Sequence, residues 1–270
     1  MTVITGTAAA RESLRQIGVP RAAARVLAAC AGASELCPEL PLRDGLARPA
    51  FERLGGNIGH FDESELRCAA FRTFVIDRLA RDFFTRTSGA LGVAVWPILG
   101  TRGHRLHDVP WVDIDSPEVA ELRRFVLPER PGRLQLGMCL CRPAWLDLLC
   151  GKARRQLLLV LDESVLPVAA DSFMRFLDDV SRTVASGSEL IVAFDAHTPL
   201  RPAFPLRRGS PLEVVVRRPE GEEIARYPRL RFVDGDAYAG DLGQSVAGVN
   251  AVATLHAGLG APAIAHLRVV

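Results

Sequence analysis

The sequence lacks an apolar run of the roughly 18–20 residues that a helix needs to cross a bilayer. Its first residues, MTVITGTAAARESLRQ, also lack the basic segment followed by an apolar segment that marks a secretory signal. Without an export signal, we expect a cytoplasmic protein whose six cysteines are reduced thiols. A membrane is therefore not expected among its partners.

An excess of charge of either sign is absent as well. Basic residues number 33 and acidic residues 31, which leaves a formal net charge of +2. The charges are spread along the chain and do not form the basic footprint that is typical of nucleic-acid-binding proteins. We therefore expect no nucleic-acid partner and a surface like that of an ordinary globular protein.

The spacings that mark metal sites are missing too. Cys139 and Cys141 are separated by a single residue, whereas a CxxC motif has two residues between its cysteines, and no histidine cluster lies near them. The six histidines are dispersed, and no HExxH pair occurs. We predict no metal site.

What the sequence does contain is a change of pattern near residue 87. Residues 8–31 and 63–86 carry apolar residues at helical spacing, and a further helical segment is expected near 47–54. Later segments alternate between short apolar runs and helical patterns, which is typical of a parallel sheet with right-handed crossovers. Strands are predicted in VAVWPIL, WVDID, RLQLGMCL, RQLLLVLDESVL and SELIVAFDAH, and antiparallel strands in PLEVVVRRP, PRLRFVD and AIAHLRVV.

These patterns predict one α/β domain over residues 1–270, with a mostly parallel, Rossmann-like sheet flanked by helices. Residues 1–86 would form a helical N-terminal cap, and 87–200 a βαβ core of the cofactor-binding type. Residues 201–270 would supply the strands that complete the sheet. A chain of 270 residues with 49% hydrophobic residues can fill such a core.

Polar residues follow several of the predicted strands, where an open parallel sheet binds its ligands. Asp113 and Asp115 end the second strand on the same side, and a carboxylate there can accept hydrogen bonds from both hydroxyls of a ribose. Glu163 follows the fourth strand. Each of these acids can equally be a strand-end residue that faces water or pairs with an arginine. The residues alone leave both interpretations open.

Two further side chains are candidates for a site. Arg72 lies on the helical segment 63–86 and could clamp a carboxylate with two hydrogen bonds, or it could be a solvated surface arginine. His197 comes just after the fifth strand and could act as a general base toward a hydroxyl or carboxyl substrate. A loop histidine without a role is the alternative for His197.

Several stretches together resemble the leucine carboxyl methyltransferase family and its relatives, the bacterial polyketide O-methyltransferases. They are FRTFVIDRLARDFF, LGTRGHRL, WVDIDSPEVAELRR and LDESVLPV, and RDGLA is a shorter match. In LGTRGHRL the matching residues are Thr101, Arg102, Arg105 and Leu106, and the shorter match contains Asp44. The stretches occur in the family's order and cover residues 40–200. The resemblance implies the class I methyltransferase fold, S-adenosylmethionine as cofactor, and methyl transfer to a carboxyl or hydroxyl of a small, natural-product-type substrate.

The resemblance also implies roles for individual residues. Arg72 would bind the carboxylate of the cofactor, and Asp115 would accept hydrogen bonds from its ribose. Cys139 takes the place of an aspartate beside the adenine, and Leu140 can pack on the ring. Glu163 matches the glutamate of the family's Glu-Gly-Val-Leu segment.

The loop after the first strand departs from the family. The family's Leu-Gly-x-Gly aligns with residues 95–98, so Trp96 and Ile98 stand in place of both glycines, and Gly100 replaces an aspartate. In the family the cofactor lies against the backbone of this loop, where a side chain would occupy the same space. One interpretation is an active methyltransferase whose loop is shifted, with Gly100 and Gly103 supplying the turn. The other is a retained fold without methylation, which uses the cofactor for cyclisation or lyase chemistry, binds another ligand, or serves as a scaffold.

Overall fold

A computed structural model describes residues 21–38, 40–138, 144–151, 155–161, 170–194, 212–214 and 263–269. Its helices are α2 (Arg21–Leu36), α3 (Ala47–Arg53), the 3₁₀ helix η1 (Ile58–His60), α4 (Glu63–Arg86), α5 (Arg102–Arg105), α6 (Pro117–Val126), α7 (Ala144–Cys150) and α8 (Ala170–Thr183). Its strands are β1 (Leu91–Val95), β2 (Trp111–Asp115), β3 (Arg133–Gly137), β4 (Leu157–Leu161), β5 (Glu189–Phe194), β6 (Leu212–Val214) and β7 (Ala263–Val269).

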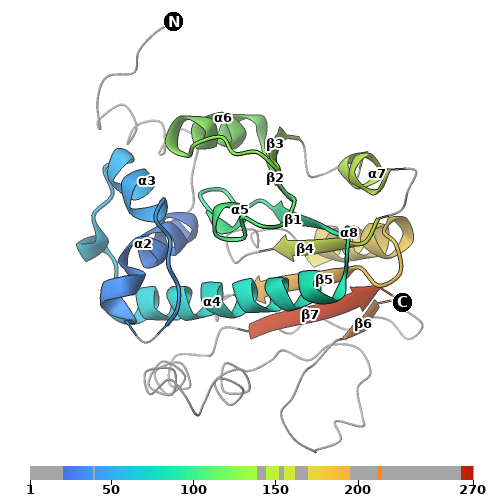
Figure 1. The fold of residues 1–270 in the computed structure, drawn as a ribbon, viewed down its shortest axis with the longest axis horizontal. Coiled ribbons are helices and arrows are strands. Elements are labelled where there is room, and N and C mark those ends of the chain that lie inside the picture. Colours follow the sequence, from blue (N-terminus) through green and yellow to red (C-terminus); the bar gives the residue numbers. More distant parts are fainter. Residues whose placement is uncertain are drawn as a thin grey trace, which may run out of the picture.

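The strands form one seven-stranded sheet with the order β3-β2-β1-β4-β5-β7-β6 (Figure 1). Strands β1 to β5 run parallel, whereas β7 lies antiparallel to both β5 and β6. The strand order reverses between β1 and β4, which is the point where doubly wound sheets bind ligands. This topology confirms the predicted class I methyltransferase-like fold. The predicted strand PRLRFVD lies outside the described residues.

The helix predicted over residues 63–86 is confirmed by α4, and its ends follow from local chemistry. The side chain of Asp62 accepts hydrogen bonds from the backbone N–H groups of Ser64 and Glu65, and so caps the first turn. Helix α6 begins in a similar way, because Ser116 caps it and Pro117 occupies its first turn. The first predicted strand is corrected: β1 ends at Val95, not at residue 99, because the backbone turns left-handed directly after it.

Helices cover both faces of the sheet, and each face has its own hydrophobic cluster. One cluster joins α2, α3, α4 and α6 to residues such as Ala94 and Leu158. The other joins α7 and α8 to alternate residues of the same strands, such as Val93 and Leu159. Strands β1 and β4 are therefore buried on both faces, and the continuous apolar sequence of β4 is typical of such a strand. Figure 1 shows α4 running along the sheet, with α2 and α3 together at the left.

A buried carboxylate ties the C-terminal strand β7 to the rest of the sheet. Glu189 on β5 accepts hydrogen bonds from Arg86 of α4 and from Arg268 of β7, and its Oε2 lies 2.8 Å from Nε2 of His266. Burial works to raise the pKa of Glu189, but the bonds from His266 and Arg86 hold it at about 2. Three elements that are distant in sequence thus converge on one charge.

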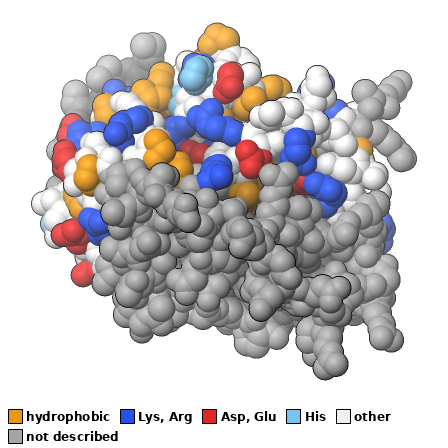
Figure 2. Space-filling model, turned by 60° about the horizontal axis from the view of Figure 1, so that its bottom comes forward, with side chains coloured by type: hydrophobic (Ala, Val, Ile, Leu, Met, Phe, Trp, Pro, Cys, Tyr) orange, Lys and Arg blue, Asp and Glu red, His pale blue; other side chains and the backbone are white. Residues whose placement is uncertain are grey.

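The surface of the described residues carries charge of both signs. Figure 2 shows one face, where basic side chains lie among acidic and apolar ones. None of the helices in the ranges given above is both long and apolar enough to span a membrane.

Candidate cofactor site

The loop that leaves β1 has the backbone conformation that glycine favours, although it contains no glycine at the two positions concerned. Trp96 has φ 55° and Ile98 has φ 47°, both in the left-handed region. Each such residue costs about 1–2 kcal/mol, and a branched side chain such as that of Ile98 is especially unusual there. These are the two positions that align with the glycines of the Leu-Gly-x-Gly segment in the family that the sequence resembles. The loop therefore keeps a left-handed backbone, which glycine adopts most easily, although tryptophan and isoleucine occupy these positions.

Apolar contacts account for the side chains of this loop. Ile98 is only 6% exposed and belongs to the cluster beneath α2, α3, α4 and α6. Trp96 is half-buried and packs against the other cluster, on the side of α7 and α8. Burial of a large apolar side chain stabilises by about 1.5–3 kcal/mol, which offsets the strain of the backbone.

The expectation that Gly100 and Gly103 supply a shifted turn is corrected for Gly103, which lies in α5. Neither has a positive φ, whereas Trp96 and Ile98 do. Gly103 is required for a different reason: a Cβ there would lie 2.6 Å from Cδ1 of Trp111, so the absence of a side chain makes room for the indole. Gly100 closes the turn, because its N–H donates to the carbonyl of Pro97 at 2.6 Å.

Asp115, the predicted ribose-binding acid, lies directly beside this loop. Its Oδ1 accepts the backbone N–H of Ile98 at 3.0 Å. Its Oδ2 is 3.5 Å from Nε of Arg123 and has no hydrogen-bond partner among the described residues. The side chain is 0% exposed, and this burial raises the pKa of Asp115 to about 7 against the lowering effect of Arg123. A buried acceptor without a donor costs about 1–3 kcal/mol, so a ligand hydroxyl that reached Oδ2 would be bound favourably.

Asp113, two residues earlier on the same strand, is in contrast fully paired. It accepts hydrogen bonds from Arg133 at 2.7 Å, from Arg123 at 2.8 Å and from the indole N–H of Trp111 at 3.1 Å. Burial works to raise the pKa of Asp113, but the two guanidinium groups outweigh it and hold this pKa below its usual range. Asp113 is therefore a structural ion-pair partner, and Asp115 is the acid with acceptor capacity left.

Arg72 is buried in the middle of α4, with 4% of its surface exposed. The alternative of a solvated surface arginine is therefore wrong. A buried guanidinium must be compensated by hydrogen bonds or by negative charge. Binding of a cofactor carboxylate by Arg72 stays a prediction.

Other residues of the matching stretches form a buried ion network between the N-terminal helices and the sheet. Arg105 donates to Asp77 at 2.5 Å and to Asp44 at 2.7 Å, and Arg102 donates to Asp77 at 2.8 Å. The hydroxyl of Thr101 also hydrogen-bonds to Asp44. The sequence signal for this network was the resemblance of these stretches to the family, but the pairing itself was not predicted.

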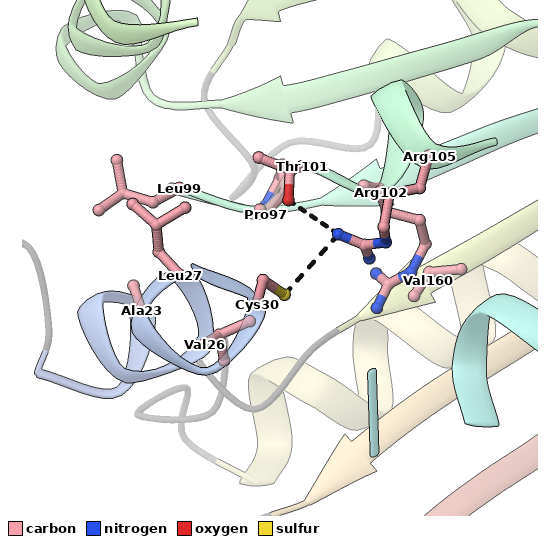
Figure 3. A pocket seen from close by; sticks show the side chains of 12 residues that line it. Ala23, Val26, Leu27, Cys30, Pro97, Leu99, Thr101, Arg102, Arg105 and Val160 are labelled. Atoms are coloured by element: carbon pink, nitrogen blue, oxygen red, sulfur yellow. Dashed lines mark hydrogen bonds between the residues drawn. The ribbon is translucent and has the colours of Figure 1, made fainter. Parts of the chain in front are cut away.

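A small cavity lies between α2 and the loop, beside this network (Figure 3). Its lining includes Leu27, Cys30, Pro97, Arg105 and Val160. Its volume of about 20 Å³ holds one water molecule and no larger ligand. Burial raises the pKa of the Cys30 thiol to about 12, so this group stays protonated.

The remaining predicted site residues, Cys139, Leu140, Glu163 and His197, lie outside the described residues. Their roles stay predictions. Within the ranges that the structure describes, no three His, Cys, Asp or Glu side chains are grouped so that they could hold a metal ion.

Comparisons with known proteins support part of the resemblance. No protein-family model matches the chain. The tetracenomycin polyketide synthesis O-methyltransferase of Streptomyces glaucescens is 28% identical over 169 residues, which are 60% of this chain. The match spans 60% of the length of that relative. The resemblance to bacterial polyketide O-methyltransferases is thus confirmed as a sequence similarity, and the one to leucine carboxyl methyltransferases stays a prediction.

The solved structures that are similar to the chain are named for several different activities. An N-methyltransferase from Bradyrhizobium japonicum is 11% identical, with a TM-score of 0.37, and the match covers 74% of this chain and 96% of that one. Geranyl diphosphate C-methyltransferase from Streptomyces coelicolor is 12% identical, with a TM-score of 0.40 and coverage of 73% and 79%. A probable spermidine synthase from Corynebacterium glutamicum is 16% identical, with a TM-score of 0.35 and coverage of 49% and 50%. Likenesses of this strength identify no reaction. By its own sheet topology the chain has a class I methyltransferase-like fold, and in sequence it is similar to a polyketide O-methyltransferase.

Proposed function

We propose that the protein is an S-adenosylmethionine-dependent methyltransferase that acts on a hydroxyl or carboxyl oxygen of a small, natural-product-type molecule. The observation that carries this proposal is the pairing of a left-handed loop at Trp96 and Ile98 with Asp115, whose Oδ2 still lacks a donor. The similarity to a polyketide O-methyltransferase supports the same substrate class.

The described residues fit the cofactor in two respects. Asp115 lies at the carboxyl end of β2, with an acceptor oxygen for a ribose hydroxyl. The apolar side chains of Ile98 and Trp96 pack against the two hydrophobic clusters. The backbone of the loop keeps the left-handed conformation that glycine residues would give it. Arg72 would neutralise the cofactor's carboxylate, and Cys139 and Leu140 would contact the adenine.

The cofactor, when bound, supplies a methyl group on an activated sulfonium. The protein's contribution is then to hold that group against the acceptor oxygen of the substrate, because methyl transfer depends mainly on positioning. Asp115 would orient the ribose, and the loop would orient the adjoining chain. His197 is the candidate that would take the proton of a hydroxyl substrate.

Titration calorimetry with S-adenosylmethionine and S-adenosylhomocysteine tests the proposal. We expect micromolar affinity, weakened about 10- to 100-fold in Asp115→Asn, because the amide keeps one acceptor oxygen for the N–H of Ile98 and places an NH₂ donor where the ligand hydroxyl needs an acceptor. Asp108→Asn is the matched control, since its side chain is 63% exposed and its ion pair is with Arg81 of α4. The absence of binding heat at millimolar cofactor would exclude the proposed activity.

A second candidate function is a non-methylating enzyme of the same fold, or a protein that binds another ligand in the same place. The observation that favours it is the strain at Trp96 and Ile98, which glycine would avoid. The reaction product separates the candidates. Release of S-adenosylhomocysteine means methyl transfer, whereas release of methylthioadenosine means that the other end of the cofactor reacted.

A further inference from the structure

Arg123 on α6 is a fully buried arginine that reaches into the loop after β1. Its Nη1 donates to the carbonyl of Ile98 at 2.5 Å, and its Nη2 donates to the carbonyl of Gly100 at 2.9 Å. The same guanidinium donates to Asp113 at 2.8 Å and lies 3.5 Å from Asp115. The side chain is 0% exposed. One cation thus contacts both the loop backbone and the two acids of β2.

These contacts hold the strained residue of the loop from both sides. The N–H of Ile98 donates to Asp115, and its carbonyl accepts from Arg123. A left-handed isoleucine persists only where its surroundings over-determine it, and two charged partners on adjacent peptide groups meet that requirement. The planar guanidinium has several N–H groups in a fixed fork, so it can bind two carbonyls and a carboxylate at once.

We propose that Arg123 is a positioning residue for the cofactor: it keeps loop 96–100 in its left-handed conformation and keeps the carboxylate of Asp115 in place beside that loop. The inference rests on the proposed function, because the loop and Asp115 are the parts that would hold the cofactor. Arg123 itself touches neither the cofactor nor the substrate in this assignment. It acts through the carbonyls of Ile98 and Gly100 and through the carboxylate of Asp115.

Arg133 on β3 offers a matched control. It donates to the same carboxylate, Asp113, at 2.7 Å, and its side chain is also largely buried. Among the described residues, none of its hydrogen bonds reaches the loop carbonyls that Arg123 holds. Replacement of either arginine by lysine retains the positive charge beside Asp113 and removes the forked N–H groups of the guanidinium. Only Arg123→Lys also removes hydrogen bonds to the loop carbonyls.

The experiment combines hydrogen exchange of the cofactor-free protein with cofactor titration, on wild type, Arg123→Lys and Arg133→Lys. In Arg123→Lys we expect amides of the peptide 96–100 to exchange about tenfold faster and S-adenosylmethionine affinity to fall about tenfold, since charge-assisted bonds to the loop are lost. In Arg133→Lys both quantities should stay within about threefold of wild type. Equal effects of the two replacements would overturn the inference, because Arg123 would then be only a structural ion-pair partner.

Two further outcomes are informative. In wild type the amide of Ile98 should be protected to a degree similar to that of the β1 amides, and fast exchange there would overturn the inference even if Arg123→Lys failed to fold. If wild type binds no S-adenosylmethionine, the proposed function fails. The exchange comparison of the loop still decides whether Arg123 holds it, so the two failures are distinguishable.

Discussion

At the scale of the residue, Ile98 concentrates the conflict between side chain and backbone in this loop. Its side chain is buried in the cluster beneath the N-terminal helices, which favours a large apolar residue. Its backbone is left-handed, which favours glycine. The neighbouring Leu99 is equally buried but is not among the residues with positive φ. The two positions differ in backbone conformation rather than in burial, which allows a direct comparison.

Alanine and glycine replacements should therefore rank in opposite orders at these positions. Ile98→Gly should be more stable than Ile98→Ala by about 1 kcal/mol, because alanine retains the left-handed strain. Leu99→Gly should be less stable than Leu99→Ala by about 0.5–1 kcal/mol, the usual order. Urea unfolding of the four variants measures both differences. The same order at both positions would contradict the left-handed conformation of Ile98.

At the scale of the element, the attachment of β7 depends on the charge of Glu189. Helix α4 supplies Arg86, β7 supplies His266 and Arg268, and all three converge on this carboxylate. The pKa of Glu189 in the folded state, about 2, is below its ordinary value of 4.5. The native state therefore binds fewer protons than the unfolded state, and the stability from this charge is present above about pH 4.5 and is lost as the pH falls toward 2.

Glu189→Gln should destabilise the protein by on the order of 3 kcal/mol at pH 7, since the shifted carboxylate and its ion pairs are lost. The difference in unfolding free energy between wild type and Glu189→Gln should shrink as the pH is lowered from about 5 to 3. Urea midpoints across this range provide the measurement. Glu35→Gln, at an exposed ion pair with Arg48, should change stability by less than about 1 kcal/mol. A difference that does not vary with pH would show that the charge of Glu189 is not what stabilises β7.

At the scale of the whole molecule, the N-terminal helices and the sheet share one interior. Residues of α2, α3 and α4 belong to the same cluster as residues of β1, β4 and β5. Across this interior, Arg105 links Asp44, near the start of α3, with Asp77 of α4. The boundary between a cap and a core that the sequence predicts is therefore bridged by both apolar packing and paired charges.

Arg105→Met should destabilise the whole molecule by about 3–5 kcal/mol, because it leaves two buried carboxylates without their shared cation. Arg81→Met is the control: its side chain is 52% exposed, and its loss should cost less than about 1 kcal/mol. Wild type should unfold in one transition, with helix content and tryptophan fluorescence changing together. Loss of helix content before the change in fluorescence would show that the N-terminal helices unfold separately.

The local patterns of the sequence predicted much of the architecture. The apolar spacing and the cap at Asp62 are set within a few residues, and α4 spans the predicted segment 63–86. The continuous apolar run at β4 predicted a strand buried on both faces, which the structure confirms. The alternation of strands and helices predicted the parallel order. Each of these features depends on neighbours in the chain, so the sequence contains it directly.

The tertiary structure alone decided how the site is built. By their positions on the strand Asp113 and Asp115 look equivalent, yet the first is fully paired and the second retains an acceptor oxygen. The pairing of Arg123 with the carbonyl of Ile98 joins residues 25 positions apart. Such contacts arise only after the fold brings α6 against the loop, because no local pattern specifies which buried charge meets which partner. Thus the sequence by itself determined the fold and the strand ends where polar residues gather, and tertiary packing determined which of those buried residues keeps an acceptor oxygen without a donor.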